Sequence, residues 1–357
     1  MLLTFAVPTY NRVENLRVAV EAISRMATSG KLETSLAISN IASRDGTSDY
    51  LKKLVETNAF GENRLFIFNE PKPETNCNFS YLDRAIPAVS DWVWVHGDDD
   101  VIIDPVNCLE VLIPYLYDES LSFIIVPQAK RAQLGLVTYK GSIQSLADEH
   151  GLHDVLGWVS QIIVRRSIYK EYAYFHWEKT RLVNTRDDVI NYRYSSFPHI
   201  NFFYEMYAES KAALILGQLI DEQTHPTEIK LHNCRQKNER AFREGVFFFC
   251  ERIAEYLKRS NRKVPVTFFR YVTKNLVFLM MDMACCRKSA GGVTYSKPSK
   301  DEINIIQQVV DCINDECFVR STSLLLKLWE REWEYKCLQE PLLLDLNSPI
   351  YKFQFSA

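Results

Sequence analysis

Residues 92–100 read Trp92-Val93-Trp94-Val95-His96-Gly97-Asp98-Asp99-Asp100. The first four residues are large and apolar, which predicts a buried strand, and three carboxylates follow it almost directly. Three adjacent carboxylates repel one another unless a cation lies among them. Oxygen ligands of this kind suit Mg²⁺ or Mn²⁺, and either ion would in turn bind a diphosphate. The alternative is a solvated acidic turn, but the preceding strand would aim these side chains at the carboxyl edge of a sheet.

Before this strand, short apolar runs alternate with stretches of helical periodicity. Strands are predicted at 2–7, 36–39, 65–68 and 92–95, and helices at 15–26, 50–56 and 79–89. The order β-α-β-α-β-α-β predicts an α/β fold with a mainly parallel sheet, whose ligands bind beyond the carboxyl ends of the strands. The residues that follow each strand are therefore the candidate site.

The rest of the chain divides into two parts. Residues 127–230 mix strand and loop patterns, with a strand predicted at 158–164 and a helix from His199 to about Ala212. We expect them to form the acceptor half of a domain 1–230, whose nucleotide-sugar-binding half is 1–126. Residues 231–357 show long helical patterns separated by a loop with Gly291-Gly292, which predicts a helical C-terminal subdomain.

The composition is that of an ordinary globular protein. In 357 residues, 42 Lys and Arg stand against 45 Asp and Glu, so no global positive field would attract nucleic acid. The N-terminus lacks the basic region of a signal peptide, and no apolar run reaches the ~20 residues of a membrane span. Nine scattered cysteines without a C-x-x-C pair predict reduced thiols and a cytoplasmic protein.

Two further polar segments follow predicted strands. The first is Pro8-Thr9-Tyr10-Asn11-Arg12, in which the proline fixes φ and the polar side chains offer hydrogen bonds to a base or a phosphate. The second runs from Asn40 to Leu51, where Ser48 or Asp49 could simply cap a helix. Each segment alone also looks like an ordinary junction between a strand and a helix.

Together these motifs resemble the family 2 glycosyltransferases of GT-A fold, in particular their abequosyltransferase-like branch. The resemblance covers 1–230 and depends on four motifs in order: Pro8–Arg12, Ala42–Leu51, Asn78-Phe79 and Trp92–Asp100. It implies a GT-A, Rossmann-like sheet. It also implies an inverting, metal-dependent transfer of a hexosyl or deoxyhexosyl group from a nucleoside-diphosphate sugar to a hydroxyl of a bacterial surface glycan (O-antigen, capsule or lipooligosaccharide).

The resemblance also implies which residues bind the donor and the metal. The donor residues would be Pro8, Thr9, Tyr10, Asn11, Arg12, Asn40, Asp45, Asn78 and Asp98. Mn²⁺ or Mg²⁺ would be bound by two of Asp98, Asp99 and Asp100, with His225 as a later ligand. The family usually has an Asp in place of Asn40, which accepts a hydrogen bond from the uracil N3–H. Since an amide can accept or donate, UDP is the first expectation and CDP the alternative.

For catalysis, the resemblance places His199 where the family has its Asp base. The marker for this register is a strand that ends in Arg165-Arg166 and is followed later by the start of a helix. Imidazole titrates near neutrality, so His199 suits the deprotonation of an acceptor hydroxyl. Asp187 and Asp188 are the rival bases, and His199 could instead only pack or cap.

The expected partners are the nucleotide-sugar donor and a glycan or lipid-linked glycan acceptor, without nucleic acid. Leu325, Leu328 and Trp329 have helical spacing in the tail, which favours a core or a homodimer interface. The alternative is an amphipathic helix that rests on the inner face of the membrane.

Two other classes of function stay open. One is a non-catalytic scaffold or interaction protein of GT-A fold, for which the replacements at Asn40 and His199 argue. The other is a sugar nucleotidyltransferase, which would want a glycine-rich phosphate loop after the first strand, and Pro8–Arg12 contains no glycine.

Overall fold

The computed structural model describes residues 1–70, 78–128, 135–180, 198–223, 250–270, 300–320 and 322–323. The chain divides into two compact units, Met1–Leu231 and His232–Ala357. The first unit contains the sheet and the candidate site, and each unit is described separately below.

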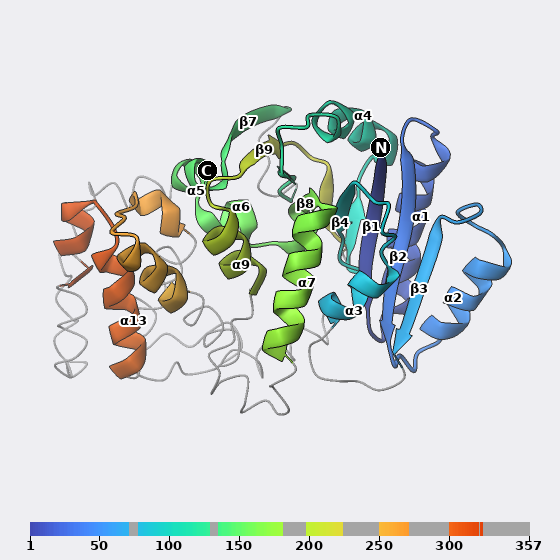
Figure 1. Cartoon of the computed structure of the whole chain (residues 1–357), viewed down its shortest axis with the longest axis horizontal. Coiled ribbons are helices and arrows are strands. Elements are labelled where there is room, and N and C mark those ends of the chain that lie inside the picture. The colour runs from blue at the N-terminus through green and yellow to red at the C-terminus, as the bar shows by residue number, and fades with distance from the viewer. Residues whose placement is uncertain are drawn as a thin grey trace, which may run out of the picture. The chain divides into compact units, whose positions relative to one another are not determined.

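Strands and helices alternate along the first unit (Figure 1). Its strands are β1 (Leu2–Thr9), β2 (Glu33–Ile41), β3 (Leu65–Glu70), β4 (Trp92–Val95), β5 (Asp100–Ile102), β6 (Phe123–Ile125), β7 (Val137–Ser142), β8 (Ile162–Arg165), β9 (Lys211–Leu216) and β10 (Ile220–Glu222). Its helices are α1 (Val13–Thr28), α2 (Thr47–Glu56), α3 (Asn78–Ala85), α4 (Pro105–Leu116), α5 (Ile143–His150), α6 (Leu152–Leu156), the 3₁₀ turn η2 (Val159–Gln161), α7 (Arg166–Thr180) and α9 (Pro198–Tyr207).

Among the described residues, eight strands form one sheet in the order β3-β2-β1-β4-β8-β6-β9-β7. Strands β1 to β4 run parallel to one another, and β9 runs parallel to β6. Strand β8 is antiparallel to both of its neighbours, and β7 is antiparallel to β9. The predicted α/β fold with a mainly parallel sheet is confirmed. Because β1, β2 and β4 are parallel, the segments that follow them meet at one edge of the sheet.

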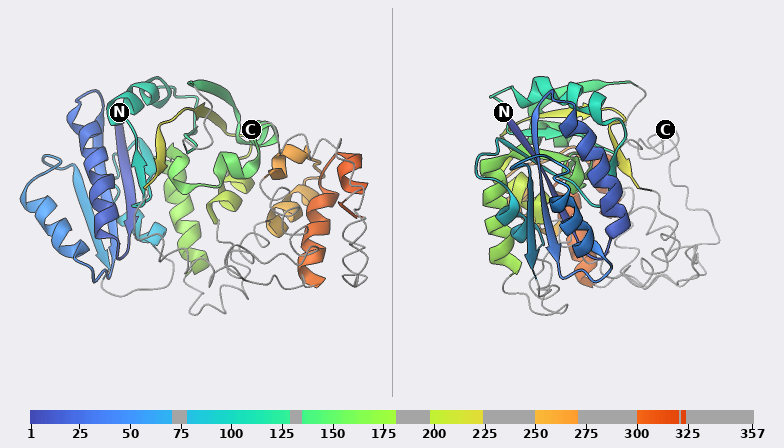
Figure 2. Two further views of the ribbon diagram at one scale, coloured as in Figure 1. Left: turned by 180° about the vertical axis from the view of Figure 1, so that it is seen from behind. Right: turned by 90° about the vertical axis from the view of Figure 1, so that its right-hand side faces the viewer.

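Helices cover both faces of this sheet. The chain moves in one direction from β1 through β2 to β3, so right-handed crossovers place α1 and α2 on the same face. The return from β3 to β4 runs the other way and places α3 on the opposite face, where it packs beside α7. Figure 2 (right) shows the sheet edge-on, with α1 and α2 on one side and α7 on the other.

The central strands are buried on both faces, which explains their almost continuous apolar sequence. The Trp94 ring of β4 packs on the Phe5 ring of β1 with 5.1 Å between their centroids. Both tryptophans of β4 also satisfy their indole N–H groups: Trp92 donates to the Leu116 carbonyl and Trp94 donates to the Ser160 carbonyl. These bonds fix the end of β4 from which the candidate site begins.

Three predicted element bounds are wrong. Helix α3 ends at Ala85 and does not reach Val89, because Pro87 cannot continue a helix and disfavours the helical conformation of the residue before it. Helix α9 ends at Tyr207, and Ala212 lies in β9. The strand predicted at 158–164 begins only at Ile162, since the preceding residues form the turn η2.

The second unit is helical where the structure describes it, as the spacing predicts. Residues 250–259 are helical, and η3 (Val266–Phe269) and α13 (Lys300–Asp311) follow. Ile253, Leu257, Ile306 and Val310 are buried at helical spacing. Leu325, Leu328 and Trp329 lie outside the described residues, so their role stays a prediction.

Candidate functional site

The acidic turn, defined as Asp98 to Asp100, joins β4 to β5 at the carboxyl edge of the sheet. Gly97 precedes it in a tight position. A Cβ on Gly97 would lie 2.8 Å from the carboxylate oxygens of Asp99 and Asp100 and 3.1 Å from the Ser160 hydroxyl. The Gly97 N–H donates to that hydroxyl at 2.7 Å. The turn therefore folds its own carboxylates back over the backbone, and a side chain at Gly97 would displace them.

Asp98 is buried and has a protein donor for each carboxylate oxygen. The Thr9 hydroxyl at the end of β1 donates to Oδ2 at 2.7 Å, and Nη1 of Arg12 donates to Oδ1 at 3.0 Å. Burial raises the pKa of Asp98 to about 6, although Arg12 and Thr9 favour the charged form. Two predicted donor residues and the first aspartate of the acidic turn therefore lie in direct contact.

Arg12 bridges two carboxylates of the acidic turn. Its Nη1 also lies 2.7 Å from Oδ2 of Asp99, whose side chain is 48% exposed. Burial lowers the pKa of Arg12, but the negative charges of Asp99 and Asp98 outweigh burial and raise it. Among the three aspartates, Asp99 is the one that reaches solvent, since Asp98 and Asp100 are buried.

Asp100 is held by a residue outside the predicted site. The indole N–H of Trp158, which stands just before η2, donates to Asp100 Oδ2 at 3.0 Å. Ser160 in η2 accepts the Gly97 N–H, as described above. The sequence pattern predicts a strand at Trp158 and Ser160 and no role for them in the site. The antiparallel pairing of β8 with β4 is what brings η2 to the acidic turn.

The segment Pro8–Arg12 turns sharply between β1 and α1. Asn11 adopts a left-handed conformation with φ of 52°, which Asn tolerates better than most residues. Its N–H donates to the Ser43 hydroxyl at 2.9 Å, and its Oδ1 accepts the Arg44 N–H at 2.7 Å. Asn11 thus ties two loops together, while the Tyr10 ring stays 51% exposed at the same edge.

Asp45 connects the starts of two helices. Its Oδ2 accepts the Val13 N–H at the start of α1 at 2.9 Å, and its Oδ1 accepts the N–H and the hydroxyl of Thr47 at the start of α2. Burial raises the pKa of Asp45, but the hydrogen bonds from Thr47 and Val13 outweigh burial and hold it below its ordinary value. The Asp45 carboxylate therefore joins the start of α1 to the start of α2 by hydrogen bonds.

Asn40 is buried at the end of β2, and its side-chain amide forms hydrogen bonds through its nitrogen. Its Nδ2 donates to the Ser48 hydroxyl at 3.1 Å and to Oδ1 of Asn69 at 3.0 Å. Its Oδ1 accepts no hydrogen bond from any residue that the structure describes. The unused capacity of this side chain is therefore that of an acceptor.

His199 makes its contacts with residues outside the acidic turn. It lies in the first turn of α9, and its ring is buried against the carbonyls of Leu156 and Gly157. Burial lowers the pKa of His199 to about 4, although these carbonyls favour the charged form. Nearby, Nδ1 of His176 on α7 lies 2.9 Å from the Ser80 hydroxyl on α3. The predicted start of a helix at this histidine is confirmed, while its role as base stays a prediction.

The remaining predicted site residues have less structural description. Asn78 is the first residue of α3. Asp187, Asp188 and His225 lie outside the residues that the structure describes.

The donor set of the acidic turn fits a hard divalent cation in its chemistry, since carboxylate oxygens are the ligands that Mg²⁺ and Mn²⁺ prefer. Within the described residues, no three His, Cys, Asp or Glu side chains gather into a complete metal site. A magnesium site typically uses one or two carboxylates and is completed by phosphates and water. The exposed Asp99 carboxylate fits that arrangement.

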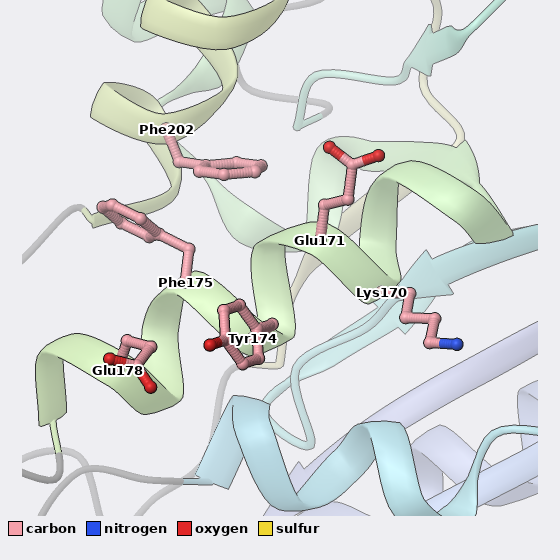
Figure 3. A pocket seen from close by; sticks show the side chains of 6 residues that line it. All are labelled: Lys170, Glu171, Tyr174, Phe175, Glu178 and Phe202. Carbon is pink, nitrogen blue, oxygen red and sulfur yellow. The ribbon is translucent and has the colours of Figure 1, made fainter.

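A shallow apolar groove lies elsewhere on the first unit, along α7 and beside α9 (Figure 3). Phe175 of α7 packs on Phe202 of α9 with 5.0 Å between the ring centroids. Tyr174 is 65% exposed, and Glu171 and Glu178 lie along the same helix. None of the residues that line this groove belongs to the acidic turn or to the segment Pro8–Arg12.

The strand order and the antiparallel β8 beside β4 confirm the predicted α/β fold with a mainly parallel sheet, and the acidic turn lies at the carboxyl edge of that sheet.

Comparisons with known proteins give a partial sequence match and structural matches of low identity. No protein-family model matches the chain. It is similar to the abequosyltransferase RfbV of Salmonella typhimurium strain LT2, with 28% identity over 116 residues, which are 32% of this chain and 33% of that protein. The match therefore spans about a third of the length of the curated relative.

Solved structures to which the chain is similar include the following two. One is S. aureus TarS 1–349 in complex with UDP, with TM-score 0.47, 11% identity, and coverage of 94% of this chain and 93% of that chain. The other is the mannosyltransferase PcManGT from Pyrobaculum calidifontis in complex with GDP-Man and Mn²⁺, with TM-score 0.46, 11% identity, and coverage of 92% and 84%.

None of the helices that the structure describes combines the length and the apolar character needed to cross a membrane.

Proposed function

We propose that this chain is an inverting, metal-dependent glycosyltransferase that moves a hexosyl or deoxyhexosyl group from a nucleoside-diphosphate sugar to a hydroxyl of a bacterial surface glycan. The observation that carries the proposal is the contact of Thr9 and Arg12 with the acidic turn at the carboxyl edge of the sheet. This edge is where open α/β sheets bind their ligands. The similarity to an abequosyltransferase over part of the chain supports the same class.

The nucleotide would lie between the segment Pro8–Arg12 and the end of β2. Tyr10 offers an exposed ring for stacking on a base. The buried Oδ1 of Asn40 is an acceptor without a hydrogen bond from the described residues, and the N3–H of uracil is a matching donor. This supports UDP as the first expectation, while the amino group of cytosine keeps CDP as the alternative.

The metal would be bound at the acidic turn. Asp99 is the first candidate ligand because its carboxylate reaches solvent, whereas both oxygens of Asp98 already accept protein hydrogen bonds. When bound, Mn²⁺ or Mg²⁺ supplies positive charge that stabilises the leaving diphosphate. Arg12 adds a second positive charge beside the same carboxylates and can donate to phosphate oxygens.

In the reaction, the acceptor oxygen would form a bond to the anomeric carbon as the bond from that carbon to the diphosphate breaks on the opposite face. The acceptor proton would pass to a base of this chain. His199 is neutral at pH 7 and can accept a proton, but its lowered pKa of about 4 makes it a weak base. Asp188 and Asp187 therefore stay rival bases, and His225 stays a proposed metal ligand.

Calorimetry with UDP, CDP, GDP and dTDP, each in Mn²⁺ and in EDTA, tests the proposal. We expect UDP to bind best and to need the metal. The variant Asp99→Asn should weaken the metal-dependent binding about tenfold or more, since even the loss of a residue that only orients a metal ligand costs about 10- to 100-fold. Asp104→Asn is the matched control, since Asp104 caps α4 just after β5 and Asn is an equally good cap.

Two outcomes would contradict the proposal. If the folded chain binds no nucleoside diphosphate in Mn²⁺, the non-catalytic scaffold becomes the better interpretation. If Asp99→Asn and Asp104→Asn bind UDP equally well in Mn²⁺, the acidic turn is not the metal site. Release of sugar from UDP-sugars by the wild type, and its loss in Asp99→Asn, would extend the test from binding to chemistry.

A further inference from the structure

A short two-stranded ribbon, formed by β5 and β10, packs against the acidic turn. Strand β10 pairs antiparallel with β5, with Glu222 opposite Asp100 and Ile220 opposite Ile102. The register places Gln223 beside the turn, where its backbone N–H donates to the Asp99 carbonyl at 2.8 Å. A segment more than a hundred residues away in sequence is thus hydrogen-bonded to the backbone of the candidate site.

The side chain of Gln223 then binds backbone on both sides of that contact. Its Nε2 lies 2.9 Å from the Asp100 carbonyl, 3.1 Å from the Asp98 carbonyl and 3.1 Å from the Asn15 carbonyl. Its Oε1 accepts from Nδ2 of Asn15 at 3.3 Å. The side chain is buried, with 8% of its surface exposed. All of its hydrogen-bonding groups are therefore directed at the acidic turn and at α1.

Asn15 connects these contacts to the segment Pro8–Arg12. It lies in the first turn of α1, three residues after Arg12, whose guanidinium binds the carboxylates of Asp98 and Asp99. One buried amide thus joins the backbone of the acidic turn to the helix that follows the segment Pro8–Arg12. Arg12 and Thr9 hold the carboxylates, and Gln223 holds the backbone that carries them.

We propose that Gln223 is a positioning residue, which fixes the backbone of the acidic turn relative to the start of α1 and so keeps the carboxylates aimed at Arg12 and at the donor. Its effect on donor binding rests on the proposed function; its effect on the backbone does not. A residue with only a general stabilising role would weaken nucleotide binding equally with and without metal. A positioning residue would weaken chiefly the metal-dependent part.

The test compares Gln223→Met with Gln218→Met. Methionine keeps the length of glutamine but cannot donate hydrogen bonds, and Gln218 is exposed between β9 and β10. The first measurement is hydrogen exchange of the peptide that contains the acidic turn, which needs no ligand. We expect faster exchange in Gln223→Met than in the wild type and no change in Gln218→Met.

The second measurement is the ratio of UDP affinity in Mn²⁺ to UDP affinity in EDTA. We expect this ratio to fall about 10- to 100-fold in Gln223→Met, as for other residues that orient metal ligands. Asn15→Ala removes one bond to Gln223 and suits a helix, so it should show a smaller change in the same direction and serves if Gln223→Met does not fold.

The outcomes separate the two proposals. Unchanged exchange in Gln223→Met and Asn15→Ala would show that the amide does not hold the turn. Faster exchange with an unchanged affinity ratio would show that the turn is held but that its position does not matter for the donor. A wild type that binds UDP no better in Mn²⁺ than in EDTA would overturn the metal-dependent function, and with it the role of Gln223 in donor binding.

Discussion

Nη1 of Arg12 lies 2.7 Å from Oδ2 of Asp99, and the same nitrogen lies 3.0 Å from Oδ1 of Asp98. The acidic turn therefore has a protein cation of its own. A divalent ion that binds Asp99 has to compete with this guanidinium for the carboxylate. Arg12 released from Asp99 would be free to donate to a diphosphate, so metal and nucleotide binding are expected to affect this contact together.

We predict that Arg12→Gln raises the affinity for Mn²⁺ and lowers the affinity for UDP. Without nucleotide, Mn²⁺ should bind about two- to fivefold tighter, because the competing ion pair is half exposed and such pairs contribute up to about 1 kcal/mol. UDP should bind more weakly, because a charge that can contact phosphate is lost. Calorimetric titrations with Mn²⁺ alone, and with UDP at saturating Mn²⁺, measure both effects.

Arg25→Gln is the matched control, since Arg25 lies at the far end of α1 and pairs only with Glu21 among the described residues. It should change neither affinity. If Arg12→Gln weakens Mn²⁺ binding instead, Arg12 supports the metal site rather than competing for it.

Asp45→Ala should destabilise the fold by about 1 kcal/mol, the usual effect of losing a side chain that caps a helix. Three donors at the starts of α1 and α2 lose their acceptor in this variant. Since the pKa of Asp45 is held below its ordinary value, its contribution is present above about pH 4 and is lost as the pH falls further. Urea unfolding at pH 7 and pH 3 measures the difference.

Glu62→Ala, at an exposed loop position, is the control and should leave the midpoint unchanged. An Asp45→Ala protein that is as stable as the wild type at pH 7 would mean that water replaces the carboxylate at both helix starts.

Much of this site could be predicted from the sequence, because the relevant contacts follow from one rule. Parallel strands bring the ends of β1 and β4 to one edge, so the meeting of Thr9 and Arg12 with Asp98 follows from the alternation of strands and helices. The end of α3 was also signalled, by Pro87, although the apolar spacing alone extends the helix too far.

Other contacts had no local signal. Gln223 reaches Asp100 across 123 positions through a pairing only three residues long, and nothing in its own sequence marks it. Trp158 and Ser160 are apolar or small residues in a segment that reads as a strand, and only the antiparallel insertion of β8 gives them a role. The sequence therefore predicts the contacts that parallel strands make, but not the contacts made by antiparallel strands added to the sheet.

His199→Gln should change how stability depends on pH. The pKa of His199 is lowered to about 4 in the folded state, against about 6.5 when unfolded. Between these values the unfolded chain binds more protons, so the stability of the wild type rises with pH across this window. Lowering the pH from 7 to 5 should therefore reduce the free energy of unfolding of the wild type by about 2 kcal/mol through this residue. The variant lacks the histidine and should not show this reduction.

Urea unfolding at pH 7 and pH 5 measures the difference between the two proteins. His96 is also buried with a lowered pKa, but it is present in both proteins and cancels in the comparison. Burial and the charge of His199 lower the pKa of His176, so the loss of His199 eases protonation of His176 and adds to the same difference. His150→Gln removes a less buried histidine and should have a smaller effect. Equal losses in the wild type and in His199→Gln would show that His199 takes up a proton without cost. It would then titrate close to neutrality, which would strengthen its case as the base over Asp188.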